Sequence, residues 1–266
     1  MGSEMPVKKS LTCLALALFL AALLGAAGCN TVVTGSGENA TWKMDYSDFN
    51  SIEVSSAFDI TIERSDSYLV QITIDKTLYE YLKIDQRGDT LRIGLKSGYT
   101  YIGTKQEAVV NLPDLHQLKL SDASKAVVSG FSMSHSLDFS LSDASRLELQ
   151  HIIAGNCGFS LYDASQVSGS IEMDDGSFNL SDASSLALQG SAGNIDIRAS
   201  SSSDLELSDF AVVTAAVDLA SSSHAVINVS TRMDVNLSAS SDLEYIGSPK
   251  LGKLSMSGGS TLNQKQ

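Results

Sequence analysis

The chain has 266 residues, and its 31 Asp and Glu residues outnumber 18 Lys and Arg, giving a formal net charge of −13. This balance argues against a nucleic-acid partner, which needs clustered lysine and arginine, and against attraction to anionic lipid head groups. The length suffices for one large core without a split into domains. Only three prolines occur, and helix-period patterning is nearly absent, which favours β-structure.

The first 29 residues have the layout of an export signal. Lys8 and Lys9 precede an apolar run of 14 residues, 11–24, which is shorter than the ~20 residues of a membrane-spanning helix. The run leads to Ala26-Ala-Gly-Cys29, which resembles a bacterial lipoprotein signal, whose cysteine becomes the lipidated first residue of the mature chain. We therefore expect residues 1–29 to be a signal peptide and Cys29 to carry palmitate. Ordinary signal cleavage without a lipid is the alternative.

This signal also predicts a location. The protein is expected to be exported and held on the bacterial cell envelope, with its lipid anchor as the contact to the membrane. Asn30 follows the cysteine, and it is not the aspartate that favours retention at the inner membrane in some bacteria. The outer membrane is therefore the expected site. Residues 30–41 are small and polar, and they predict a flexible tether between the lipid and the folded body.

Residues 42–107 predict an irregular β-rich cap. Period-two alternation marks strands near 52–62, 69–74 and 89–95. Residues 76–82 could form a single helical turn. Residues 96–107 contain glycine and tyrosine, and they predict a loop that leaves the main body.

From residue 109 onward a Ser-rich element of five residues recurs eight times, in steps of 18 to 21 residues. Its copies are 120–124, 141–145 and 180–184 (Leu-Ser-Asp-Ala-Ser), 161–165 (Leu-Tyr-Asp-Ala-Ser), 199–203 (Ala-Ser-Ser-Ser-Ser), 219–223 (Leu-Ala-Ser-Ser-Ser), 237–241 (Leu-Ser-Ala-Ser-Ser) and 256–260 (Met-Ser-Gly-Gly-Ser). Short alternating strands lead into and out of each copy. A fixed period of this size indicates stacked coils. We predict an all-β fold, a right-handed parallel β-helix (β-solenoid) with coils of about 18–21 residues, as one domain over residues 42–266.

The fifth position of every element is serine, so stacking predicts a column of small hydroxyl side chains that turn the corners. Its members are Ser124, Ser145, Ser165, Ser184, Ser203, Ser223, Ser241 and Ser260. We interpret this column as structural, because a serine hydroxyl both donates and accepts hydrogen bonds. A nucleophilic serine would need a neighbouring base and would be expected once.

The third position predicts a second column, which covers four coils. Its members are Asp122, Asp143, Asp163 and Asp182. One interpretation is that each aspartate forms an Asx turn with the backbone two residues on. The other is a ladder of weak Ca²⁺ sites, because Ca²⁺ binds carboxylate and carbonyl oxygens. The Gly-Gly-x-Gly-x-Asp signature of calcium-binding β-rolls is absent, which favours the Asx turns.

Nothing in the sequence predicts catalysis, a resident metal or a cofactor. The four histidines (His116, His135, His151 and His224) lack zinc-site spacing, and no phosphate-binding glycine loop or nucleophile elbow occurs. Cys157 is the only cysteine beyond residue 29, so no internal disulfide can form. Its place in an alternating strand favours a buried core residue over a nucleophile.

Several segments together resemble the putative auto-transporter adhesin, head GIN domain family. They are residues 49–62 and 90–93, the Ser-Asp-Ala-Ser elements, and residues 245–249 and 257–260. The resemblance covers roughly residues 48–262. It implies a β-helical, exported and often lipid-anchored bacterial envelope protein, and it supplies no catalytic residues.

Three classes of function are compatible with these features. The first is a non-enzymatic adhesin or surface binding module for a glycan or an envelope protein, which the aromatic residues Tyr162 and Tyr245 of the coils favour. The second is a structural or sensory envelope component without a ligand, which is favoured by the lack of any basic or aromatic groove in the sequence pattern. The third is a polysaccharide-processing β-helix enzyme, which is disfavoured because the coils carry few basic residues. The sequence does not predict the oligomeric state.

Overall fold

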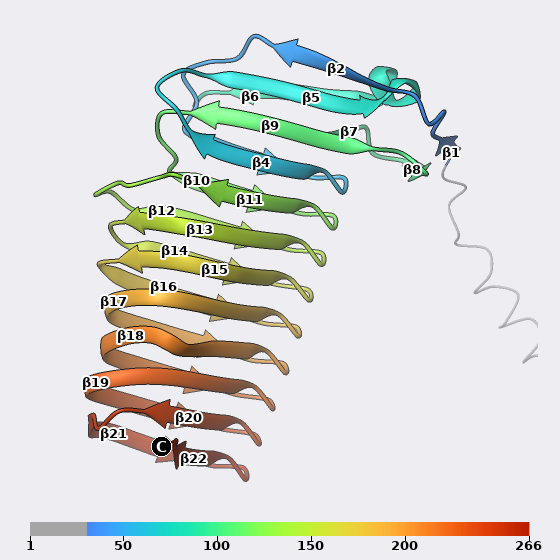
Figure 1. Ribbon diagram of the computed structural model, residues 1–266. Coiled ribbons are helices and arrows are strands. Elements are labelled where there is room, and N and C mark those ends of the chain that lie inside the picture. The colour runs from blue at the N-terminus through green and yellow to red at the C-terminus, as the bar shows by residue number, and fades with distance from the viewer. Residues whose placement is uncertain (1–30, 266) are drawn as a thin grey trace, which may run out of the picture.

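A computed structural model describes residues 31–265, and it shows a parallel β-helix that winds in a right-handed sense from the cap to the C-terminus (Figure 1). The predicted fold class is confirmed. The proposed signal peptide and Cys29 lie outside the described residues. Between residues 31 and 265 no helix is both long and apolar enough to cross a bilayer.

Two sheets run along the solenoid, and the Ser-rich corners join them. The leading sheet contains the strands that enter the corners, and the following sheet contains the strands that leave them. The leading sheet has the order β6 (Leu82–Arg87), β7 (Thr90–Leu95), β3 (Ser51–Val54), β10 (Gln117–Leu120), β12 (Leu137–Leu141), β14 (Cys157–Leu161), β16 (Asp175–Leu180), the second halves of β17 (Ser185–Ala199), β18 (Asp204–Leu219) and β19 (His224–Leu237), and β21 (Lys250–Met256). The following sheet has the order β2 (Asn39–Met44), β5 (Leu69–Asp75), β9 (Gln106–Leu112), β4 (Asp59–Arg64), β11 (Lys125–Ser129), β13 (Arg146–Ala154), β15 (Gln166–Met173), the first halves of β17, β18 and β19, β20 (Asp242–Ile246) and β22 (Thr261–Gln264).

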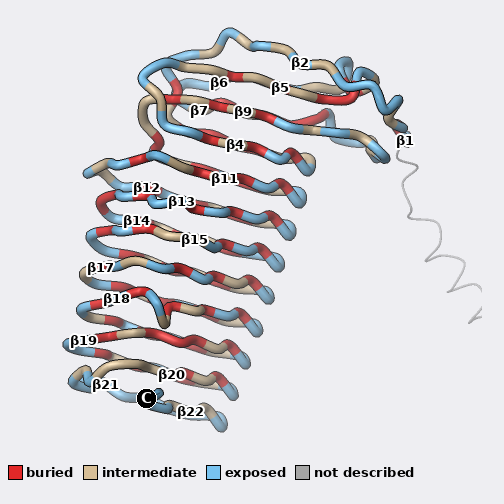
Figure 2. The backbone as a smooth tube through the Cα atoms, viewed as in Figure 1, coloured by how far each residue is buried: buried red, intermediate tan, exposed pale blue. Residues whose placement is uncertain are grey.

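The period-two alternation of the sequence decides which side chains face inward. In β12 the burial pattern alternates strictly, with Leu137, Phe139 and Leu141 buried, and Figure 2 shows the same alternation along the other coils. Identical positions of successive coils stack inside. The rings of Phe139 and Phe159 lie 5.0 Å apart, and those of Phe159 and Phe178 lie 5.2 Å apart. Each coil therefore buries its apolar face against its neighbours, as a stacked repeat requires.

Each Ser-rich corner is a tight turn with two residues in the left-handed region. At the corner 121–124, Asp122 and Ala123 have φ angles of 54° and 60°, and the backbone N–H of Ser124 donates to the carbonyl of Ser121 at 3.1 Å. Positive φ at both central positions defines a type I′ turn, which suits Asp, Asn and Gly. Within residues 31–265 nine corners carry such a pair of positive φ angles.

The register of the following sheet shifts at bulges between three pairs of neighbouring coils, next to Leu149, Ala187 and Leu207. Gly169 in β15 and Gly190 in β17 have φ angles of 126° and 131°. A side chain at either position would collide with a backbone carbonyl of the preceding coil, that of Leu149 or Ile171. Only glycine fits such a close approach, so these two residues allow the chain to change direction without unstacking.

The cap is built by an excursion from the first coil. The chain forms β3 and β4, and then β5, the 3₁₀ helix η2 (Lys76–Tyr81) and β6 to β9 build the layers above that coil. β10 then pairs with β3, and β11 pairs with β4, on the other side of the same coil. The predicted helical turn is confirmed by η2. The predicted excursion is confirmed for residues 96–105, where β8 (Tyr99–Ile102) pairs only with β1 (Thr31–Thr34) in the described chain, whereas Gln106 and Glu107 already belong to β9 of the following sheet.

Residues 31–41 differ from the predicted flexible tether. They form β1 and the start of β2, and β2 pairs antiparallel with β5. Asp75 fastens the connection between these strands: its carboxylate accepts the hydroxyl of Ser36 at 2.9 Å and the backbone N–H of Gly37 at 2.8 Å. The segment has the composition of a linker, but strand pairing and the buried carboxylate of Asp75 hold it on the cap. Neither contact can be recognised from the local sequence.

Candidate functional site

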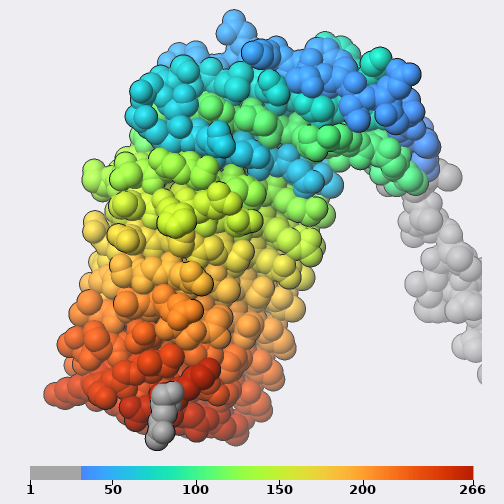
Figure 3. Space-filling view, in the orientation of Figure 1, coloured from blue at the N-terminus to red at the C-terminus, as the bar shows by residue number. Residues whose placement is uncertain are grey.

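A groove lies where the cap overhangs the first corners of the solenoid. Residues 96–105 leave the stack and carry β8 outward beyond the corners 55–58 and 121–124 (Figure 1). Figure 3 shows the hollow beneath this overhang. The groove has a volume of about 940 Å³, and its walls come from β3, β6, β7, β8 and β10 together with the two corners.

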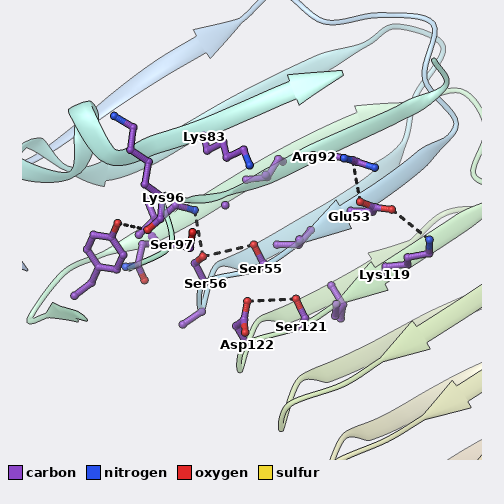
Figure 4. Close-up of a pocket in the computed structure, with 18 of the residues that line it drawn as sticks. Glu53, Ser55, Ser56, Lys83, Arg92, Lys96, Ser97, Lys119, Ser121 and Asp122 are labelled. Carbon is purple, nitrogen blue, oxygen red and sulfur yellow. Dashed lines mark hydrogen bonds and ion pairs between the residues drawn. The ribbon is translucent and has the colours of Figure 1, made fainter. Parts of the chain in front are cut away.

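A row of charged side chains crosses the floor of the groove. The register of β7, β3 and β10 places Arg92, Glu53 and Lys119 opposite one another on three adjacent strands. Glu53 binds both cations, at 3.0 Å to Arg92 and 3.2 Å to Lys119 (Figure 4). Cross-strand neighbours of opposite charge stabilise a sheet. Glu53 thereby holds two cationic side chains in place on the floor.

The groove is more basic than the rest of the protein. Its lining contains Lys83, Arg92, Lys96 and Lys119 against three acidic residues, whereas the whole chain has a net charge of −13. Lys83 and Lys96 are exposed, and neither takes part in an ion pair within residues 31–265. Both ammonium groups are therefore available to an anionic ligand.

An aromatic cluster forms the overhanging wall. Tyr99 and Tyr101 of β8 line the groove, and Tyr81 packs behind them with its ring 4.8 Å from Tyr99 and 5.9 Å from Tyr101. The hydroxyl of Tyr101 donates to the carbonyl of Lys96 at 2.7 Å. Burial, with the neighbouring tyrosines, raises the pKa of Tyr101. The wall thus offers neutral aromatic surface next to free ammonium groups.

The overhang is tied to the first corner. The backbone N–H of Leu95 donates to the hydroxyl of Ser56 at 3.2 Å (Figure 4). A side chain at Gly94 would collide with the hydroxyl of Ser55. Glycine at position 94 therefore leaves room for the present rotamer of the Ser55 hydroxyl beside β7.

The groove corrects the expectation that the protein lacks a basic or aromatic groove. The sequence pattern of the repeated coils contains no such groove, and the residues that form it come from strands that are distant in the sequence: Lys119 pairs with Glu53 across 66 residues. The one available signal was the segment 96–107, which combines Lys, Tyr and Gly in a loop.

The serine column lies where the repeat predicts it. Seven of its members are at most 1% exposed, Ser124, Ser145, Ser165, Ser184, Ser203, Ser223 and Ser241, while Ser260 in the last coil is partly exposed. Four hydroxyls, on Ser145, Ser165, Ser203 and Ser260, donate to the carbonyl that begins their own turn, as Ser165 does to Tyr162 at 2.5 Å, and that of Ser241 donates to Leu219 of the preceding coil. The other three, on Ser124, Ser184 and Ser223, have no partner in the described chain. These contacts close the turns, which supports a structural role.

The aspartate column is exposed and forms a different contact from the predicted Asx turn. Asp122, Asp143, Asp163 and Asp182 all occupy the first left-handed position of their corners. The carboxylate of Asp143 accepts the hydroxyl of the preceding Ser142 at 2.6 Å, and Asp182 accepts that of Ser181 at the same distance. The type I′ backbone closes the turn without an Asx contact, and the local contact is not common to the whole column, because a tyrosine precedes Asp163. Within residues 31–265 the four carboxylates form no group of three ligand atoms within 4.8 Å of one another.

The remaining residues singled out from the sequence are dispersed. Cys157 is buried, and burial raises the pKa of its thiol to about 12, which fits the predicted core role and not a nucleophile. Tyr162 is 43% exposed and Tyr245 is partly buried. They lie in different coils, and neither lines the groove.

Comparisons with known proteins agree with this architecture. The family model described as putative auto-transporter adhesin, head GIN domain matches residues 48–249. A putative adhesin from Parabacteroides merdae superposes with a TM-score of 0.82 at 18% identity, over 89% of this chain and all of that chain. A protein from Parabacteroides distasonis described as a putative lipid binding protein has a TM-score of 0.83 at 20% identity, with the same coverage.

These structural likenesses establish the fold alone, because both identities are below 25%. No curated protein matches the chain. The family match spans most of the sequence and includes the first coil, the cap from β5 to β9 and all but the last of the Ser-rich corners. The chain therefore belongs to the putative auto-transporter adhesin, head GIN domain family.

Proposed function

We propose that this protein is a non-enzymatic binding module of the bacterial cell envelope that captures a carboxylated polysaccharide in the groove beneath the cap. The observation that carries the proposal is the pairing of free lysines with a tyrosine wall on an otherwise acidic protein. Sugar rings have apolar faces that pack on aromatic side chains, and their carboxylates match ammonium groups. The adhesin description of the family agrees with a binding role.

The arrangement of the acidic groups favours binding over hydrolysis. A glycoside hydrolase needs two carboxyl groups flanking the scissile bond, one of them free to act as an acid. Glu53 is held between Arg92 and Lys119, and Asp85 pairs with Arg87 at 2.7 Å. Of the three groove carboxylates only Asp122 takes part in no ion pair within residues 31–265, so the groove offers no pair of free carboxyl groups. An enzyme that processes polysaccharides is the less favoured alternative.

Titration with polygalacturonate and with neutral dextran tests this proposal. We expect the wild type to bind polygalacturonate, to ignore dextran and to release no reducing ends from either polymer. Lys83→Gln and Lys96→Gln should each weaken binding severalfold, while Lys250→Gln, an exposed lysine of β21 outside the groove, should bind like the wild type. Equal affinity in all four proteins, or no binding by the wild type, would reject the groove as the site.

We further propose that Cys29 carries a lipid that attaches the protein to the outer membrane. Only one residue, Asn30, separates Cys29 from the first residue of β1. A lipid at this position would hold the cap end of the solenoid near the membrane and direct the C-terminal coils away from it. A palmitate analogue supplied to cells should label the wild type and not Cys29→Ser, and equal labelling of both proteins would contradict the anchor.

A further inference from the structure

A second cluster of side chains lies at the edge of the leading sheet opposite the corners. Asp114 lies in the link between β9 and β10, His116 directly precedes β10, and His135 lies two residues before β12. β10 and β12 are paired, and the backbone N–H of Asp138 donates to the carbonyl of His116 at 3.0 Å. Stacking of two successive coils thus brings together residues that the sequence pattern treated as scattered.

The three side chains converge on one another. The carboxylate of Asp114 lies 3.0 Å from Nε2 of His116 and 2.6 Å from Nε2 of His135. The two imidazole rings are stacked with centroids 4.1 Å apart. All three ligand atoms lie within 4.8 Å of one another, and in the described part of the chain no other group of three His, Cys, Asp or Glu side chains does so.

The hydrogen bond at Nδ1 of His135 determines which of its ring nitrogens carries a proton. Its Nδ1 lies 2.9 Å from the carbonyl oxygen of Ser136, and a carbonyl only accepts hydrogen bonds, so Nδ1 carries a proton. In the neutral ring Nε2 then presents a lone pair to the Asp114 carboxylate at 2.6 Å. Two lone pairs at this distance repel unless a positive charge lies between them. That charge is either a proton, which makes the ring cationic, or a metal ion.

We propose that Asp114, His116 and His135 bind one Zn²⁺ ion. Two imidazole nitrogens and one carboxylate oxygen are a ligand set typical of zinc sites that keep an open coordination position. A backbone carbonyl that accepts the second ring N–H is the usual support of a ligating histidine, and Ser136 supplies it to His135. The metal would take the place between Asp114 and His135 that otherwise requires a proton.

To bind one ion, the two imidazole rings must turn out of their stacked arrangement so that both Nε2 atoms point at the metal, and Asp114 must move away from His135. A tetrahedral Zn²⁺ places its ligand atoms roughly 3.4 Å apart, inside the present limit of 4.8 Å. The three side chains are between 34% and 46% exposed, so they can adjust and an ion can enter. The remaining coordination positions would face solvent, open to water or to a donor atom of a ligand.

The chain contains a matched control for this site. His224 lies 3.3 Å from Asp242, and this pair on β19 and β20 belongs to no group of three potential ligands between residues 31 and 265. It therefore has the histidine–carboxylate contact of the proposed site without the second imidazole. If any exposed His–Asp pair sufficed to bind zinc, a histidine substitution at either place would weaken zinc binding equally.

Calorimetric titration of the purified protein with Zn²⁺ tests the assignment. We expect one saturable site per chain, an affinity at least about tenfold weaker in His116→Gln, His135→Gln and Asp114→Asn, and an unchanged affinity in His224→Gln. Circular dichroism and thermal melting without metal verify that each variant is folded. Titration with Co²⁺, which reports nitrogen and oxygen ligands by its visible absorption, provides a second measurement on the same variants. Absence of saturable binding by the wild type, or an equal affinity in His135→Gln, would overturn the site.

Discussion

Phe58 and Ser124 occupy the same position in two successive coils. The strands on either side fix this register, because Val54 pairs with Leu120 and Asp59 pairs with Lys125. The backbone N–H of Lys125 donates to the carbonyl of Phe58 at 2.8 Å. Phe58 is fully buried. The serine column therefore ends beneath a phenyl ring at the coil where the cap begins.

This relationship predicts that Phe58 stabilises the junction of cap and solenoid. Phe58→Ala would leave a cavity in a fully buried position, so we expect the free energy of unfolding to fall by about 3–5 kcal/mol. Urea denaturation measures it. Tyr162→Ala, at an exposed corner, should change it by no more than about 0.5 kcal/mol. Equal midpoints for both variants would show that Phe58 does not support the junction.

The fold could be predicted largely because one corner chemistry repeats. A type I′ turn requires two residues in the left-handed region, and Asp-Ala, Ser-Ser and Gly-Gly all supply them in the Ser-rich elements. The corner 55–58 was missed for a physical reason. Its turn has the same φ angles, but phenylalanine replaces the serine, and the excursion that builds the cap separates it by 66 residues from the next coil.

The groove could not be predicted because it depends on which strands of the cap become neighbours, and the histidine cluster could not because it depends on the course of the loop before β12. β10 pairs with β3 and not with β9, its predecessor in the chain, and this order puts Lys119 beside Glu53. His116 and His135 meet only because the loop before β12 lies next to the start of β10. Local periodicity identifies the strands, and it contains no information on the stacking order of a cap that departs from the repeat.

Ser165 is more deeply buried than Ser260, so the same substitution should destabilise the protein more in the middle of the serine column than at its end. Ser165→Leu would force a bulky side chain into a fully buried position between two coils, at a cost of about 1–3 kcal/mol from overpacking. Ser260→Leu should cost less, because Ser260 is partly exposed in the last coil and can relax outward. Urea midpoints of the two variants provide the measurement. A larger loss at Ser260 would contradict the column as the source of the effect.

Asp75 gives the attachment of residues 31–37 a pH dependence. Burial opposes its ionisation, but hydrogen bonds from Thr77 and Ser36 outweigh this and hold the pKa of Asp75 well below its usual range. Because the folded pKa is the lower one, the stabilisation is fully present above the unfolded value of about 3.9. It is lost as the pH falls from there through the folded pKa.

We therefore expect Asp75→Ala to melt below the wild type, with a difference in Tm that is constant between about pH 5 and 7 and shrinks in stronger acid. Thermal melts across this range measure it. Asp66→Ala, in which the lost carboxylate is 85% exposed, should show a much smaller difference at every pH. A difference for Asp75→Ala that grew on acidification would contradict the assigned sign.

At the exposed aspartate column, stability should depend on whether the residue tolerates the left-handed backbone conformation and not on Ca²⁺. Asp143 has a φ angle of 56°, which asparagine tolerates well and a β-branched residue does not. Asp143→Asn should leave stability unchanged or raise it by at most about 1 kcal/mol, because repulsion from the neighbouring carboxylates is removed. Asp143→Val should lower it by about 1–2 kcal/mol. Thermal melts of both variants with and without Ca²⁺ distinguish the two roles. The structural role requires that Ca²⁺ leave every Tm unchanged, whereas a rise in the wild type that Asp143→Asn abolishes would establish a cation ladder instead.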